Sequence, residues 1–77
     1  MIKITFFVSW DGNRYCIDGT LPTMPSAVCT NIRVGHYEFE IQRIKFHSKG
    51  ERVEIYLKEN CNVNDNILHD EGWILME

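Results

Sequence analysis

The sequence predicts an all-β protein: a small curled antiparallel sheet or barrel, SH3-like or related, of five to six strands built from three consecutive hairpins. Three observations predict it. Apolar and polar residues alternate over short stretches, which is the period of half-buried strands. Turn-forming residues separate these stretches at short intervals. One alternation changes phase partway, which needs a bulge of the kind that bends small barrels. A two-layer β-sandwich and a strand-exchanged dimer are the alternatives.

The length and composition favour one globular unit. The chain has 77 residues, of which 44% are apolar and 12% aromatic. This composition excludes disordered and low-complexity classes. A chain this short buries only about 60% of the surface exposed by its unfolded form, so we expect residues 1–77 to form a single domain with a marginal core. No apolar run approaches the roughly 18 residues of a membrane span, and no secretory leader is visible.

The first hairpin is predicted over residues 2–10 and 13–21. In the first stretch the even-numbered residues are apolar and the odd-numbered ones are mostly polar, as expected of a half-buried strand. Asp11-Gly12 then supplies a two-residue turn, since a type I′ turn needs positive φ at both positions. This turn places Val8 opposite Tyr15 and Phe6 opposite Ile17, so that apolar residues pair on one face.

The second hairpin is predicted over residues 30–34 and 37–41, joined at Gly35-His36, after a connecting loop over residues 22–29. Its register places Ile32 opposite Phe39, and on the other face it places Arg33 opposite Glu38. Opposite charges on neighbouring strands stabilise such a pairing.

The third hairpin contains the change of phase. Apolar residues are odd-numbered up to Ile41 and even-numbered from Ile44, so a bulge is expected near Gln42-Arg43. Lys49-Gly50 is the expected turn. The expected pairs are Phe46 with Val53, Ile44 with Ile55 and Gln42 with Leu57, and on the other face Arg43 with Tyr56, Lys45 with Glu54 and His47 with Arg52.

The last third of the chain has a weaker pattern. Residues 60–72 are rich in asparagine and predict an irregular segment, in which Ile67-Leu68 forms either one helical turn or a loop anchor. Residues 73–76 are apolar, and we expect them to form a closing strand or to dock on the core, with Trp73 as the anchor.

Charge and cysteine content constrain the partners. The net charge of −3 disfavours nucleic acid, which attracts positively charged surfaces. Three cysteines without a C-x-x-C pair predict reduced thiols in a cytoplasmic protein.

No pattern of a catalytic, cofactor or metal site is present. The sequence lacks a phosphate-binding glycine loop, a G-x-S-x-G elbow and an H-E-x-x-H motif. Its cysteines and histidines are scattered rather than paired at the short spacings of zinc sites. We therefore expect no enzyme activity, no cofactor and no metal.

The first functional hypothesis is a non-catalytic protein-interaction module, either a homo-oligomer or an accessory or inhibitory subunit of a larger complex. Phe7 lies on the polar face of its strand, with Cys16 directly across from it, so an apolar spot is expected there. The alternative is that the segment 73–76 covers Phe7. Trp10, beside the first turn, is the third candidate for contact with a partner.

The second hypothesis is a small nucleic-acid-binding β-barrel that uses the outer face of the third hairpin. In such a group the cations can contact phosphates, and the aromatic side chain between them can stack on a base. The candidate residues are Arg43, Lys45, His47, Arg52 and Tyr56. Charged residues that merely protect a strand edge would give the same pattern.

One resemblance is general. The stretch from Pro22 to Leu57, with Pro25, Gly35 and the alternation Tyr37-x-Phe39-x-Ile41, looks like the general style of short bacterial or phage β-barrel proteins. This pattern occurs in many unrelated barrels and implies no activity.

Overall fold

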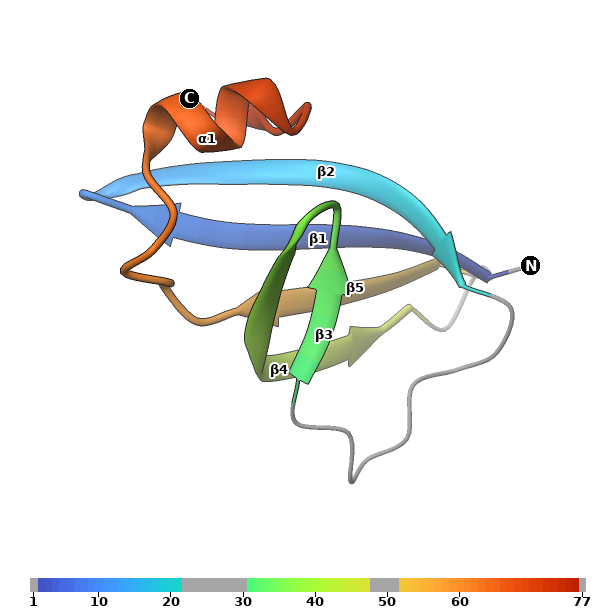
Figure 1. The fold of residues 1–77 in the computed structure, drawn as a ribbon. Coiled ribbons are helices and arrows are strands. Elements are labelled where there is room, and N and C mark those ends of the chain that lie inside the picture. Colours follow the sequence, from blue (N-terminus) through green and yellow to red (C-terminus); the bar gives the residue numbers. More distant parts are fainter. Residues whose placement is uncertain (1, 22–30, 48–51, 77) are drawn as a thin grey trace.

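A computed structural model describes residues 2–21, 31–47 and 52–76 as a strongly curled mixed sheet that forms a half-barrel around one core (Figure 1). Six strands lie in the order β3-β4-β5-β1-β2-β6. The elements are β1 (Ile2–Trp10), β2 (Asn13–Leu21), β3 (Asn31–Val34), β4 (Tyr37–Phe46), β5 (Arg52–Leu57), α1 (Asp65–Asp70) and β6 (Ile74–Met76).

The first hairpin has the predicted register along its whole length. β1 and β2 pair antiparallel from Trp10 opposite Asn13 to Ile2 opposite Leu21. Asp11 and Gly12 both have positive φ, 50° and 79°, as the two-residue turn requires. Gly19 faces the core, where a Cβ atom would lie 3.1 Å from the ring of Phe6. The ring therefore occupies the space that a side chain at this position would need.

The second hairpin and the bulge are also confirmed. β3 and β4 pair with Ile32 opposite Phe39 and Arg33 opposite Glu38. The pairing of β4 with β5 shifts register between Ile41 and Arg43, which divides β4 into two halves. One half pairs with β3 and the other with β5, so the sheet turns a corner at this point.

One predicted pair in this region is wrong. Leu57 lies opposite Ile41 rather than Gln42, because the bulge leaves Gln42 without a partner in the ladder. The expected loop over residues 22–29, the pairing of Thr30 and the turn at Lys49-Gly50 lie outside the described residues.

The expectation of a purely antiparallel sheet is wrong. β1 pairs with β5 in parallel, with Ile4 opposite Val53 and Phe6 opposite Ile55, so the sheet is mixed. Hairpin turns in a sequence determine pairing within each hairpin, whereas a parallel contact between residues 49 positions apart leaves no local signal. As a result, β1 lies inside the sheet between β2 and β5.

The core lies on the concave side of the half-barrel. Ile4 and Ile55, on the two central strands, are fully buried, and Leu68 of α1 is also fully buried. The other buried apolar side chains are Phe6, Val8, Tyr15, Val34, Phe39, Val53, Leu57, Val63 and Trp73. They come from the strands, from the loop before α1 and from the segment after it, so all these elements share one core.

The C-terminal segment over residues 64–76, which we call the tail, covers one end of the core. Ile67-Leu68 forms a helical turn, and the side chain of Asn64 caps α1 by accepting a hydrogen bond from the Ile67 amide at 2.9 Å. Trp73 packs edge-on against Phe39 with 5.8 Å between ring centroids. β6 then pairs antiparallel with β2 and forms the outermost strand at that edge, so the segment adds a sixth strand to the sheet but does not close it.

A polar contact joins the tail to the second hairpin. Glu71, at the end of α1, accepts a hydrogen bond from the His36 amide at 3.0 Å, and the same oxygen lies 2.9 Å from Nδ1 of His36. The tip of the β3–β4 hairpin is thereby held against the helix. Over the part of the chain that the structure describes, no helix has the length and apolar character needed to cross a bilayer.

The central position of Ile55 gives a stability prediction. Its side chain is 0% exposed, so Ile55→Ala should lower the free energy of unfolding by about 2–5 kcal/mol, through lost burial and the cavity that remains. Urea denaturation followed by tryptophan fluorescence measures this loss. The exposed control Ser9→Ala should change stability by less than about 0.5 kcal/mol. Equal effects of the two substitutions would contradict the assignment of Ile55 to the core.

Candidate functional site

The outward side chains of the sheet form the candidate site. We call this region the outer surface: the side opposite the core on β1, β2, β5, β6 and the part of β4 after the bulge. Because side chains alternate along a strand, the registers place these residues on one face. Its members are Lys3, Thr5, Phe7, Ser9, Arg14, Cys16, Asp18, Thr20, Arg43, Lys45, Arg52, Glu54, Tyr56, Ile74 and Met76.

Charge is unevenly distributed between the outer surface and the rest of the molecule. The outer surface carries five of the eight basic residues of the chain, namely Lys3, Arg14, Arg43, Lys45 and Arg52. Asp18 and Glu54 are its two carboxylates. The outer surface is therefore positively charged, although the net charge of the whole chain is −3.

An aromatic stack occupies the centre of the outer surface. The rings of Phe7 and Tyr56 stack with 5.0 Å between centroids and 15° between planes. The guanidinium of Arg43 lies 4.5 Å from the centroid of the Tyr56 ring. Phe7 and Arg43 come from strands on opposite sides of β5, so both faces of this ring are covered. A base would have to displace Arg43 in order to stack on Tyr56.

Glu54 lies in the middle of the positive residues. Its carboxylate accepts a hydrogen bond from the Tyr56 hydroxyl at 2.9 Å and lies 3.2 Å from Nε2 of His47. The hydrogen bond from Tyr56 lowers the pKa of Glu54, and His47 and Lys45 lower it further, while partial burial opposes them. Glu54 thus stays ionised and offsets part of the positive charge nearby.

The structure brings the five predicted nucleic-acid residues together in two groups. Lys45, His47 and Tyr56 lie around Glu54, and Arg43 packs on the ring of Tyr56. The pairs Arg43 with Tyr56 and Lys45 with Glu54 are those expected from the sequence. Arg52 is the first residue of β5, and its side chain reaches toward β1 instead, where its Nη2 donates to the hydroxyl of Thr5 at 3.0 Å.

The partner-binding candidates do not all lie together. Phe7 and Cys16 are opposite each other, and Ile74 of β6 lies next to Cys16 in the same row. Trp10 faces the other side of the sheet and packs against the core. The tail does not cover Phe7, since β6 adds to the edge of β2; Tyr56 packs against Phe7 instead.

Two features of the outer surface were not predicted from the sequence: the exposed side chain of Ile74 and the contact of Phe7 with Tyr56. The contact depends on the parallel pairing of β1 with β5, which has no sequence signal. Ile74 could have been found, because a strand at residues 74–76 beside β2 necessarily directs alternate side chains to opposite faces.

The structure describes two of the three cysteines, and neither belongs to a group of side chains that could hold a metal ion. Cys16 is half-buried and Cys61 is exposed, and both are free thiols; Cys29 lies outside the described residues. Within residues 2–21, 31–47 and 52–76, no group of three or more histidine, cysteine, aspartate or glutamate side chains is placed to hold a metal ion.

The Glu54 cluster predicts a dependence on pH. A carboxyl group with a lowered pKa in the folded state stabilises the fold above the ordinary range for glutamate and loses this effect as the pH falls below about 4. Tyr56→Phe should raise the pKa of Glu54. The variant should therefore lose less stability than the wild type when the pH falls from neutral to below about 4. Carboxyl-detected NMR titration and urea denaturation at both pH values measure these changes. Tyr37→Phe is the matched control, and equal Glu54 titration in both variants would contradict the role of Tyr56.

Comparison with known proteins gives no relative. No protein-family model, curated protein or solved structure matches this chain.

Proposed function

We propose that this chain is a non-catalytic protein-interaction module of the cytoplasm, which self-associates or acts as an accessory or inhibitory subunit of a larger complex. The observation that carries the proposal is the edge strand β6. Four large apolar side chains of the described residues are exposed, and Ile74, Leu75 and Met76 of β6 supply three of them. Ile74 is 65% exposed.

The two edges of the sheet differ in how they are protected. Proteins commonly guard an exposed strand edge with charged residues or proline, because unpaired backbone groups can pair with another strand. β3, at one edge, carries Arg33, which is exposed and opposite Glu38. β6, at the other edge, carries neither a charge nor a proline. An added strand would therefore meet exposed apolar side chains, with no charge on the strand to deter it, at the β6 edge.

The apolar surface continues from β6 onto the sheet. Cys16 lies beside Ile74, and Phe7 lies beside Cys16, so the row crosses three strands. A partner that adds a strand to β6 would gain main-chain hydrogen bonds there and side-chain contacts along this row, as in other cases of β-strand addition.

Charge introduced at β6 tests the proposal. Ile74→Lys should abolish self-association, or binding of the cognate subunit, because it places a charge in the apolar contact. Sedimentation velocity over a concentration series and affinity capture measure both. Phe46→Lys is the matched control, since Phe46 is 58% exposed but lies on β4, outside the row. A wild-type chain that stays monomeric and captures no protein, or equal effects of both variants, would contradict the proposal.

A second candidate function is binding of single-stranded nucleic acid. The concentration of five basic residues on the outer surface supports it, although the total charge is negative. Phosphate contacts are electrostatic, so binding of this kind weakens steeply with salt.

Fluorescence anisotropy of a labelled oligonucleotide at a series of salt concentrations tests this candidate. Lys45→Gln should weaken binding and reduce the logarithmic salt slope by about one, the change expected for one lost phosphate contact. Arg33→Gln removes the same charge from β3 and should leave the slope unchanged. Binding that is absent at low salt would eliminate the candidate.

We also retain as a proposal the relation to SH3-like barrels. The strong curl of the sheet and the corner at Gln42 support it, since small barrels bend their strands in this way.

A further inference from the structure

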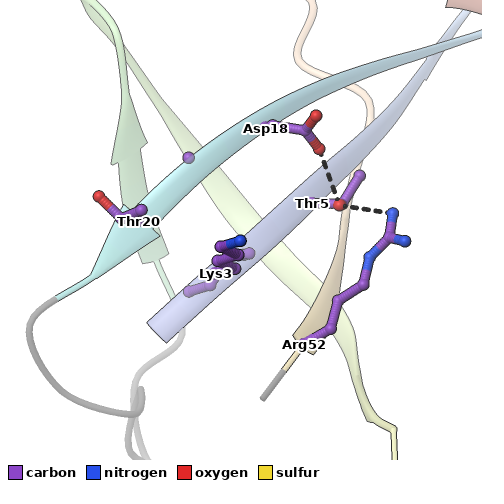
Figure 2. Close-up of a pocket in the computed structure, with 7 residues that line it drawn as sticks. Lys3, Thr5, Asp18, Thr20 and Arg52 are labelled. Atoms are coloured by element: carbon purple, nitrogen blue, oxygen red, sulfur yellow. Dashed lines mark hydrogen bonds between the residues drawn. The ribbon is translucent and has the colours of Figure 1, made fainter. Parts of the chain in front are cut away.

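A hollow lies on the outer surface where β1 and β5 begin and β2 ends, and neither candidate function explains it. Its volume is about 550 Å³, within the range of small-ligand sites, and it lies where β1, β2 and β5 meet. Figure 2 shows its side chains, which come from all three strands. The lining consists of Lys3, Ile4, Thr5, Asp18, Gly19, Thr20 and Arg52.

Two cations lie side by side at this hollow. Lys3 and Arg52 are direct partners in the parallel ladder between β1 and β5 and face the same way. Like charges directly opposite each other on adjacent strands repel. Among the described residues, no carboxylate forms an ion pair with either of them. Within the part of the lining that the structure describes, Asp18 is the one carboxylate, and its hydrogen bond goes to Thr5, so the two cations leave a net positive charge at the hollow that a bound anion would offset.

A hydrogen-bonded chain fixes one of the cations. Thr5 is 5% exposed, and its hydroxyl accepts from Nη2 of Arg52 at 3.0 Å while donating to Oδ1 of Asp18 at 2.9 Å (Figure 2). Arg52 uses one of its N–H groups here and keeps the others for a ligand. The guanidinium is thus held in position before a ligand arrives, which lowers the entropy lost on binding.

The chemistry of the lining indicates the ligand class. Arginine and lysine together bind phosphate oxygens, arginine through two parallel hydrogen bonds and lysine as a point charge. Thr20 supplies a further hydroxyl at the edge of the hollow. The second oxygen of Asp18 repels an anion but accepts a hydrogen bond from a hydroxyl group. The set fits a molecule that has both a phosphate and a hydroxyl group.

We propose that this hollow binds a small phosphomonoester that carries a hydroxyl group, with Lys3 and Arg52 on the phosphate and Asp18 on the hydroxyl. The site is independent of the β6 edge, so Ile74→Lys should leave it intact.

NMR titration of the isotope-labelled protein with glycerol phosphate tests the proposal. We expect saturable shifts at Thr5, Gly19, Thr20 and Arg52, and weaker binding of inorganic phosphate. Lys3→Gln and Arg52→Gln should each weaken binding by about tenfold, the effect of losing one charged hydrogen bond. Arg33→Gln removes an equal charge from β3 and should retain wild-type affinity.

Several outcomes would overturn the proposal. Shifts that match those caused by sodium chloride at the same ionic strength would reduce it to charge screening, as would unchanged affinity in Lys3→Gln. Inorganic phosphate that binds as tightly as glycerol phosphate would remove the contact with Asp18.

A measurement without ligand supplies a second readout. Lys3→Gln should raise the midpoint of thermal unfolding, because it relieves the repulsion from Arg52. Arg33→Gln should not raise it, because Arg33 lies opposite Glu38. A midpoint lowered by Lys3→Gln would show that Lys3 and Arg52 do not repel each other measurably, and would overturn the proposal.

Discussion

The parallel pairing of β1 with β5 is the contact on which the remaining structure depends. It places β1 between two neighbours, so Ile4 and Phe6 meet partners from both sides and the core forms beneath them. On the other face the same pairing brings Phe7 against Tyr56 and Lys3 beside Arg52. The core, the aromatic stack and the hollow therefore share one origin.

The bulge in β4 determines the shape of this sheet. Without it, Ile41 and Ile44 would lie on opposite faces of a straight strand, and one of them would leave the core. The register shift lets both pack toward the interior and turns the β3–β4 hairpin over the concave side. The tip of that hairpin then reaches α1, where Glu71 holds His36. The half-barrel is thus closed at one end by polar contacts and helix packing.

Contacts between residues close in sequence were predictable, whereas contacts between distant segments were not. The turns at Asp11-Gly12 and Gly35-His36 are local signals, and each led to the correct register. The phase change at Gln42 is also local and located the bulge, although the predicted partner of Leu57 was wrong by one residue. The pairing of β1 with β5 joins hairpins that are far apart in sequence, and no residue pattern specifies it. The site followed the same rule: the positions of Arg43, Lys45 and Tyr56 within one hairpin were predictable, whereas the contacts of Phe7 and Arg52 across β1 and β5 were not.

The order of the strands also has a consequence for how the chain folds. Residues 2–21 can form their hairpin early, because the turn between them is short and its register is strongly specified. The other side of β1 must then wait until residues 52–57 have been synthesised and can reach it. Contacts between distant segments are slow to form because the intervening loop must first close. During synthesis the central strand of the finished molecule is consequently an open edge, and folding is completed only when a late segment arrives to cover it.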